Sequence, residues 1–308
     1  LTQSAVSQMI ANLEESIGVQ LFDRQVRPIA LTPSGIILIE KARALLLAAR
    51  DAINSAREPT ASAFPRLNLC LVHTVAGTIG AALISQVKEY ATLWSVHAGL
   101  HSQHNQSLLG RTADIVVSPD PLEHEAGLER HPVVKERFFL ALPRSYTKEV
   151  DGLGRLAEDL DMVRFSSRTM LGRQIERHLR RLRIEVKGRV EFDNSDAVLA
   201  MVAGGLGWSL ITPTCALLGR SFWPQLRFER MPDPALYRRL FVVARQGELG
   251  DIPVKIASNA IASLSETFNS KFLPEYSWAV KDCTIAEPPL KVQALKNGHL
   301  SGSTLTGC

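Results

Sequence analysis

The strongest constraint on the fold is an alternation of strand-like and helix-like segments over residues 66–272. RLNLCLVH (66–73) alternates leucine with other residues, and TVAGTIGAALISQVKEY then has the apolar spacing of a helix. The same order recurs through ADIVVSPD, ERFFLALP, GRQIERHLRRLR and GRVEFDNSDAVLAMVAGGLGWSLITP. Strand–helix–strand repeats with short connections predict an α/β sheet with helices on its faces. At more than 200 residues, the region is expected to form two lobes.

A different pattern occupies the first 18 residues, which predict one helix between Thr2 as N-cap and Gly18 as stop. Apolar residues recur on one side at helical spacing: Val6, Ile10, Leu13 and Ile17. The other side has short, uncharged, hydrogen-bonding side chains: Gln3, Ser4, Ser7 and Gln8. Such a face fits a DNA major groove, where Gln can make two hydrogen bonds to adenine. A helix in the core of an unrelated domain fits the pattern equally well.

The next segment, VQLFDRQVRPIALTPSG, predicts a hairpin followed by a second helix capped by Thr32. Arg24 and Arg27 lie in the hairpin, with Asp23 as the only acid between the two predicted strands. This placement suits contacts with phosphates beside a groove, although surface arginines in hairpins are common.

Together, TQSAVSQMIANLEESIGVQLFDRQVRPIALTPSG resembles the winged helix-turn-helix of LysR-type transcriptional regulators. In that family a first helix and most of a second precede this point, so residues 1–35 are expected to be an incomplete winged helix-turn-helix. The resemblance implies DNA contacts by Gln3, Ser4, Ser7 and Gln8 with bases, and by Arg24 and Arg27 with phosphates. At residues 11 and 12 the family often has a basic residue, whereas this chain has Ala and Asn.

Residues 36–58 are expected to form a linker and dimerisation helix. From Pro33 to Ala56 there is no second Pro, and apolar residues alternate four and three apart, as in a heptad seam: Leu38, Ala42, Leu45, Ala49, Ala52 and Ala56. In the family this helix pairs two copies, and a long core helix of a monomer is the alternative. Residues 59–65, with Pro and small residues, then predict a hinge.

The region 66–272 resembles the effector-binding region of LysR-type regulators, itself similar to type 2 periplasmic binding proteins, through LLGRTADIVVS and AVLAMVAGGLGWSLITP. The resemblance implies one subdomain of residues 66–142 plus 238–272, another of residues 143–237, and a ligand between them. Residues 273–308 lose periodicity and gain Pro, Gly and Ser, so a poorly ordered tail is expected.

Helix N-termini favour anionic groups. Polar residues at three predicted helix starts and in a loop match the family's cleft-lining segments by position: Thr74, Gln103, Asn105, Ser166, Arg168, Asn194 and Ser195. A capping role is the alternative for each of them. Arg168 is the strong cation of the set and favours a carboxylate effector.

Other features argue mainly by exclusion. The four cysteines are far apart, and no apolar run is long enough for a leader or a membrane span, which favours the cytoplasm. GxSxG, HExxH and P-loop motifs do not occur, so neither catalysis nor a cofactor is expected. No cysteine or carboxylate nearby completes a metal set with His97, His101 and His104. The glycines at 204, 205 and 207 follow a helix and precede a strand, which predicts a turn rather than a nucleotide loop.

The sequence therefore predicts a non-enzymatic regulator that binds operator DNA and a small-molecule effector as a homodimer or homotetramer. Its net charge of +4 permits a polyanionic partner without requiring one. A solute-binding module without DNA binding is the alternative function, and an enzyme is the third.

Overall fold

The computed structural model describes residues 2–57, 64–188, 190–232, 234–272 and 274–287. The chain forms two compact units, one containing α1 to α2 and the other containing β3 to β13. Each unit is described by itself. No described helix has both the length and the apolar character needed to cross a bilayer.

The N-terminal unit consists of the predicted helix, hairpin and second helix. Helix α1 (Gln3–Ile17) begins where the Thr2 hydroxyl accepts a hydrogen bond from the Ala5 N–H, and it ends at Gly18 with a φ of 70°. Strands β1 (Phe22–Asp23) and β2 (Ala30–Leu31) pair antiparallel. Helix α2 (Pro33–Arg57) follows, with the Thr32 hydroxyl accepting from the Gly35 N–H at 3.0 Å.

A buried carboxylate connects α1 to the hairpin. Glu14 is 4% exposed and accepts hydrogen bonds from the N–H groups of Leu21 at 2.7 Å and Phe22 at 3.1 Å. Arg24 donates to its other oxygen at 2.9 Å. The Leu21 N–H does most to lower the pKa of this carboxyl; Phe22 and Arg24 add to the effect, and burial opposes it. Glu14 therefore stays ionised and satisfies two backbone donors of the hairpin.

The apolar residues of this unit remain largely exposed. Val6, Leu13 and Ile17 of α1 are exposed, although their spacing predicts a face that packs on a core. On α2, Leu45 is 72% exposed and Leu38 is half-buried, so the described part of the predicted seam is not fully buried within this unit. The side chains of residues 52, 53 and 56 lie outside the described part. Of the predicted hinge, residues 59–63 lie outside the described residues, whereas Phe64 and Pro65 already belong to β3.

The larger unit contains, within the described residues, a six-stranded sheet of order β13-β6-β12-β5-β3-β4. Its strands are β3 (Phe64–Val72), β4 (Ala91–Gly99), β5 (Ile115–Ser118), β6 (Leu128–Arg137), β12 (Tyr237–Arg245) and β13 (Thr284–Ile285). Strand β3 is parallel to β4 and β5, while β12 is antiparallel to β5 and β6. The three parallel strands therefore end at the same edge of the sheet.

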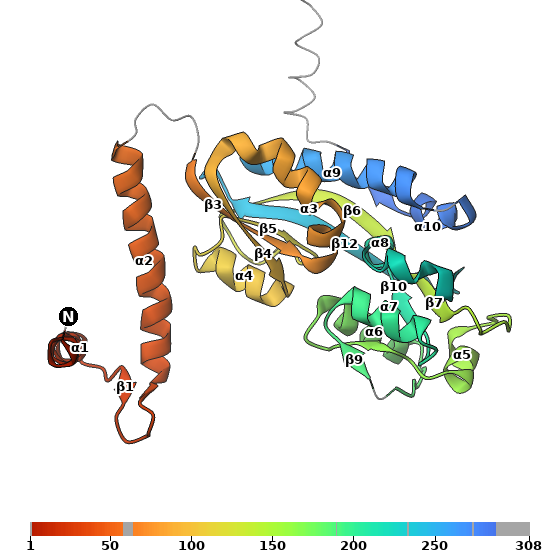
Figure 1. Cartoon of the computed structure of the whole chain (residues 1–308), viewed down its shortest axis with the longest axis horizontal. Coiled ribbons are helices and arrows are strands. Elements are labelled where there is room, and N and C mark those ends of the chain that lie inside the picture. The colour runs from red at the N-terminus through yellow and green to blue at the C-terminus, as the bar shows by residue number, and fades with distance from the viewer. Residues whose placement is uncertain (1, 58–63, 189, 233, 273, 288–308) are drawn as a thin grey trace, which may run out of the picture. The chain divides into compact units, whose positions relative to one another are not determined.

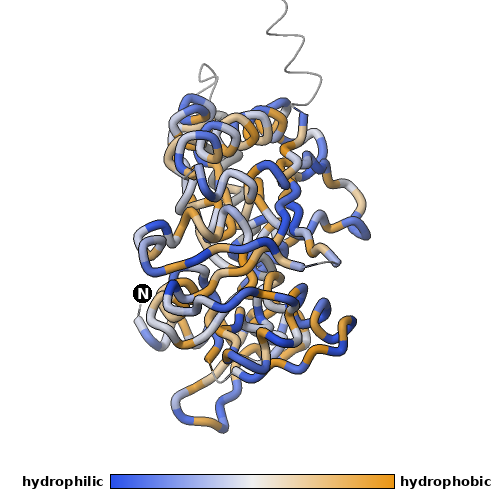
Figure 2. The backbone as a smooth tube through the Cα atoms, turned by 90° about the vertical axis from the view of Figure 1, so that its right-hand side faces the viewer, coloured by the Kyte–Doolittle hydropathy of each residue, from blue (hydrophilic) through white to orange (hydrophobic). Residues whose placement is uncertain are grey.

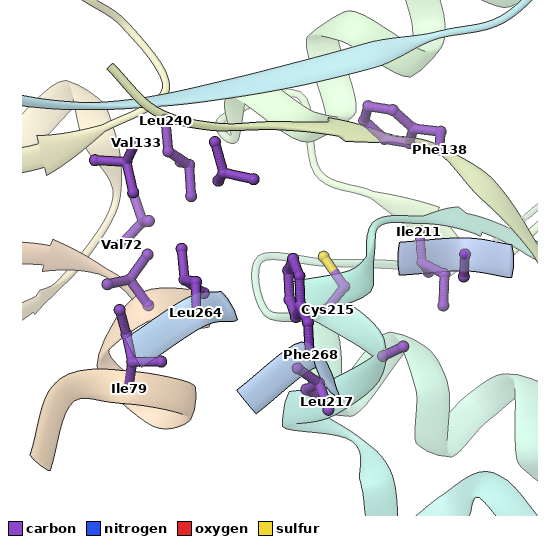
Figure 3. Packing of buried hydrophobic residues seen from close by; sticks show 14 of the residues in the cluster. Val72, Ile79, Val133, Phe138, Ile211, Cys215, Leu217, Leu240, Leu264 and Phe268 are labelled. Carbon is purple, nitrogen blue, oxygen red and sulfur yellow. The ribbon is translucent and has the colours of Figure 1, made fainter. Parts of the chain in front are cut away.

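Helices cover both faces of this sheet, as predicted for an α/β fold (Figure 1). Helix α3 (His73–Val87), continued by η1 (Lys88–Tyr90), packs against α9 (Ile252–Lys271), and α9 also contacts β6 and β12. Helix α4 (His101–Leu109) packs against β3 and β5. Buried Ile79 and Leu264 represent the core between helices and sheet (Figure 3). Hydrophobic and hydrophilic residues alternate along the chain, as expected of elements that bury one face (Figure 2).

A smaller sheet of order β10-β7-β11 forms the second lobe of the described α/β unit. Its strands are β7 (Phe139–Pro143), β10 (Ser209–Ile211) and β11 (Leu226–Arg230), with the separate parallel pair β8 (Arg164–Phe165) and β9 (Glu191–Phe192). Its helical segments are α5 (Leu153–Asp159), α6 (Met170–Arg181), α7 (Ser195–Ala203), α8 (Pro213–Leu218) and η2 (Arg220–Gln225).

The chain passes between the two sheets at Phe138 and returns between β11 and β12. ERFFLALP, expected to be one strand, is therefore divided between β6 and β7. The Phe138 N–H donates to the Leu236 carbonyl at 2.9 Å, which joins the two crossings instead of continuing a ladder. The sheets thus change at Phe138, whereas the expected subdomain boundary was residue 142.

Residues 274–287 correct the expectation of a poorly ordered tail. They form η3 (Pro274–Tyr276), α10 (Ser277–Lys281) and β13, which pairs antiparallel with β6. The ring of Tyr276 lies 5.0 Å from that of Phe228, and Trp278 lies 5.5 Å from Phe139. Aromatic packing therefore orders a segment that is too short to show periodicity. Residues 288–308 lie outside the described part of the chain.

Replacement of Tyr276 by Ala should lower the free energy of unfolding of the α/β unit by about 3 kcal/mol, because a buried aromatic ring is removed. Lys281→Ala, at an exposed position on the neighbouring α10, should change it by less than about 0.5 kcal/mol. Urea denaturation followed by tryptophan fluorescence measures both. A change of less than about 0.5 kcal/mol for Tyr276→Ala as well would show that the Tyr276 ring adds nothing to stability.

Candidate functional site

The polar face of α1 is accessible along its first two turns. All four predicted base-contacting side chains are exposed: Gln3, Ser4, Ser7 and Gln8. The first turn contains no acid, and the Gln8 amide donates to the Asn12 side chain at 2.9 Å. The helix therefore presents hydrogen-bonding groups without negative charge, which suits the approach of a polyanion.

The two hairpin arginines differ in their surroundings. Arg24 is held by Glu14 while its side chain remains 57% exposed, so it both supports the hairpin and presents charge. Arg27 lies at the turn between β1 and β2 and is exposed. The Glu14 pairing partly neutralises Arg24, a contact that the sequence did not predict.

A pocket lies in the larger unit, beyond the carboxyl ends of β3, β4 and β5, which is where ligands bind in open α/β sheets. It has an empty volume of about 430 Å³ including its open mouth. The described residues that line it are Val72, His73, Thr74, Gly99, Leu100, Pro119, Thr169, Met170, Leu171, Asp193, Asn194, Ser195 and Arg238.

Three helices begin at this pocket: α3, α6 and α7. The Thr169 hydroxyl caps α6 by accepting from the Gly172 N–H at 2.9 Å. In the described part of the chain, neither Val72 at the start of α3 nor Asn194 at the start of α7 makes a side-chain capping bond. The first-turn N–H groups of α3 and α7 thus have no side-chain cap, and their dipoles favour a negative charge in the pocket.

Arg238, on β12, contributes a buried cation that the sequence analysis missed. It is 2% exposed, and its Nη2 donates to the Thr74 hydroxyl at 3.2 Å. Its Nη1 lies 3.7 Å from the carboxylate of Glu136, which is fully buried on β6. The alternation of β12, in which Leu240 and Val242 are buried, already places Arg238 on the inner face.

Only part of the predicted effector set meets at the pocket, namely Thr74, Asn194 and Ser195. The described residues that line it do not include Gln103, Asn105, Ser166 or Arg168. Gln103 and Asn105 lie within α4 rather than in the expected loop. The Asn105 amide is occupied by Asp120 at 3.0 Å and Ser118 at 3.3 Å, because these groups meet only once β5 is placed beside α4. Ser166 is buried at the end of β8.

Arg168 is paired with an acidic residue at the pocket. Its side chain is 69% exposed and donates to Asp193, which lies at the start of α7. The Arg168 guanidinium does most to lower the pKa of the Asp193 carboxyl, and Asp193 in turn raises the pKa of Arg168. The charge of Arg168 is therefore already compensated, and the cation that lines the pocket is Arg238.

Two other sequence features, the histidine cluster and the glycines after α7, do not form a ligand site in the described part of the chain. Among the described residues, no group of three His, Cys, Asp or Glu side chains could hold a metal ion. The glycines after α7 form the predicted turn, with positive φ at Gly205 and Gly207. A Cβ at Gly207 would lie 1.9 Å from the Asp161 carbonyl oxygen, so this close approach requires glycine.

Comparison with known protein families gives two matches that divide the chain as the structure does. Residues 61–255, more than half of the chain, match the LysR substrate binding domain. Residues 1–36 match the bacterial regulatory helix-turn-helix protein of the lysR family. The chain belongs to the LysR family of transcriptional regulators. Proteins of this family bind DNA and are not enzymes, in agreement with the sequence prediction.

Curated relatives share moderate identity with this LysR-family chain. The HTH-type transcriptional regulator TfdS of Cupriavidus pinatubonensis is 24% identical over 250 residues, covering 72% of the chain and 77% of the relative. A probable hydrogen peroxide-inducible genes activator of Streptomyces viridosporus is 26% identical over 254 residues, covering 80% of each protein.

Solved structures share the fold. Full-length CbnR complexed with its target DNA superposes with a TM-score of 0.63 at 19% identity, over 85% of this chain and 91% of that one. The Corynebacterium glutamicum OxyR C206 mutant gives a TM-score of 0.57 at 23% identity, over 87% and 86%. The effector binding domain of QuiR in complex with shikimate gives 0.53 at 15% identity, over 68% and 99%. The predicted fold class of this LysR-family chain is therefore confirmed.

Replacement of Arg168 by Met should raise the pKa of Asp193 toward its ordinary value near 3.8, because the guanidinium that stabilises the carboxylate is lost. A lowered folded-state pKa stabilises the protein above the ordinary value, and this contribution disappears as the pH falls through the lowered pKa. The stability difference between wild type and R168M should thus exist at neutral pH and vanish in acid.

NMR titration of Asp193 and urea denaturation at several pH values measure the two effects. Arg177→Met, at an exposed position on α6, is the matched control and should leave the pKa of Asp193 unchanged. A pKa of Asp193 that is the same in wild type and R168M would contradict the pairing.

Proposed function

We propose that this LysR-family regulator binds operator DNA through α1 as a homodimer or homotetramer, and that a small carboxylate in the α/β unit modulates its activity. The observation that carries the effector assignment is the meeting of the uncapped starts of α3 and α7 with buried Arg238 at one pocket. The observation that supports DNA binding is the exposed, acid-free first turn of α1.

On the DNA side, Gln3, Ser4, Ser7 and Gln8 face base edges, and Arg27 binds phosphate. Arg24 contributes a second, weaker phosphate contact because Glu14 shares its charge. The structure of CbnR with its target DNA supports this arrangement by similarity of fold.

Helix α2 supplies the pairing element of the proposed dimer. It has 25 residues, or roughly 38 Å at 1.5 Å per residue, and it leaves Leu45 and Leu46 exposed. Exposed leucines near a heptad seam are stabilised when a second copy covers them. Pairing of two α2 helices would deliver two α1 helices to half-sites about one DNA turn apart.

The pocket also restricts the effector. Leu100, Met170 and Leu171 provide apolar wall, which suits an apolar body attached to the carboxylate. Arg238 is the buried cation of the described lining, and Asp193 at the same pocket is already paired with Arg168, so this lining can compensate one added negative group. We therefore favour a monocarboxylate, and the QuiR domain solved with shikimate supports this class because shikimate is a monocarboxylic acid.

Thiol oxidation is a different way to sense a small molecule, and some relatives are named as probable peroxide-inducible activators. Burial raises the pKa of Cys70 to about 11 and that of Cys283 to about 12, and Cys215 is buried. Oxidant-sensing thiols need accessible thiolate. The described cysteines therefore favour ligand binding over oxidation, while residue 308 lies outside the described part.

A regulator of operator DNA acts where the chromosome lies, so we propose a cytoplasmic location. A solute-binding module without DNA binding would explain the pocket but would leave the exposed polar face of α1 without a role.

Selection of bound duplexes from a random library tests the proposed function. Gln8→Ala should relax base preference at one position of each half-site, by about 1–3 kcal/mol of discrimination. Arg27→Ala should weaken binding to all sequences similarly and reduce the slope of log affinity against log salt by about 1, because one phosphate contact is lost.

Gln20→Ala, at an exposed position between α1 and β1, is a control that should change neither property. Identical behaviour of the Gln8 and Arg27 variants would contradict the proposed division of contacts, and absence of any selected sequence would contradict DNA recognition by this face.

A further inference from the structure

We propose that Arg238 is the residue that holds the carboxylate of the effector, through one of its two unpartnered donors, Nε or Nη1. This inference rests on the proposed function, because it takes the occupant of the pocket to be a carboxylate. It assigns the recognising cation to β12, not to the helix starts where the sequence placed it.

The first argument is that two N–H donor groups of Arg238 have no hydrogen-bond partner among the described residues. A guanidinium has five N–H donors and no acceptor, and it remains charged in proteins. In the described part of the chain, Nη2 of Arg238 donates to the Thr74 hydroxyl, while Nε and Nη1 are buried without a hydrogen-bond partner. Buried donors are rarely left unpaired. Arg238 lines a pocket that is open to solvent, so an anion that enters beside it can supply the missing acceptor for one of these two donors.

The second argument is that the counterion of Arg238 is already engaged. One Glu136 oxygen accepts from the Thr214 N–H at 2.8 Å, and the other accepts from the Thr214 hydroxyl at 3.0 Å. The nearest separation from Arg238 is 3.7 Å, which is an ion pair but exceeds hydrogen-bond distance. Glu136 therefore compensates the charge of Arg238 without saturating its donors.

The third argument is that the N-termini of two helices, α3 and α7, lie at the pocket that Arg238 lines. Thr74, which fixes Nη2, belongs to the first turn of α3, and Ser195 begins α7 at the same pocket. A carboxylate on Arg238 thus also lies in the favourable field of helix N-termini. Arg168 offers no comparable donor, because it is mostly exposed and paired with Asp193.

The arrangement also links the pocket to α8. Thr214 lies in the first turn of α8, and the carboxylate that binds it is the counterion of Arg238. An anion on Arg238 competes with Glu136 for the same positive charge. Removal of the Glu136 charge should therefore strengthen carboxylate binding.

Calorimetric titration of the full chain with acetate, benzoate and shikimate at millimolar concentration tests the proposal. For each carboxylate that binds, Arg238→Met should weaken affinity about tenfold or more, because charge-assisted hydrogen bonds are lost. Arg239→Met is the matched control, since this neighbouring side chain is exposed, and it should change affinity less than about twofold. Benzamide, a neutral analogue of benzoate, should bind wild type and R238M equally.

Two further variants separate charge from geometry. Arg238→Lys keeps the charge but lacks the rigid, planar guanidinium donors, so its affinity should fall between those of wild type and R238M. Glu136→Gln should bind carboxylates more tightly than wild type. Circular dichroism melting establishes that each variant is folded before titration.

A crystal structure of the wild-type chain with 4-bromobenzoate makes the test independent of variant folding, because bromine locates the ligand. The expected result is a carboxylate within hydrogen-bond distance of Nε or Nη1 of Arg238. Binding that survives in R238M, or a carboxylate held elsewhere, would overturn this assignment while leaving the carboxylate effector intact. Failure of all the carboxylates to bind wild type would overturn both.

Discussion

The α/β unit depends on one hydrogen-bonded crossing between its two sheets. The Phe138 N–H donates to the Leu236 carbonyl, so the outgoing and returning segments are fixed to each other. Two residues away on either side of this bond lie Glu136 and Arg238, opposite charges that are both buried. Buried charges persist only where partners compensate them. The crossing therefore places the buried carboxylate of Glu136 and the buried guanidinium of Arg238 close together. Glu136 contacts the first turn of α8, and Arg238 contacts the first turn of α3.

A buried, hydrogen-bonded carboxylate also stabilises the N-terminal unit. Glu14 satisfies two backbone donors of the hairpin and binds Arg24, which sets the position of β1 relative to α1. Among the residues whose burial is described, most large apolar side chains of α1 and α2 are exposed and contribute little to this unit by themselves. Polar contacts thus shape the unit, and its apolar surface remains available for association with another surface.

Local patterns predicted most helices and strands, including the caps at Thr2 and Thr32, because capping and periodicity act over a few residues. Contacts across long sequence separations were not predictable. Arg168 meets Asp193 from 25 residues away, and Arg238 meets Thr74 from 164 residues away, so their roles depend on the assembled fold. The register of β12 did contain the signal for Arg238, as an arginine on an otherwise apolar face.

The short strand β13 has a consequence for self-association. It covers part of β6, so the large sheet has a bound terminal segment at one border and β4 at the other. Unpaired borders of sheets are templates on which foreign strands add. Among the described strands of this sheet, β4 is therefore an edge strand with which a strand of another chain could pair. Pairing with β13 shields Val134 and Lys135 of β6 from such addition.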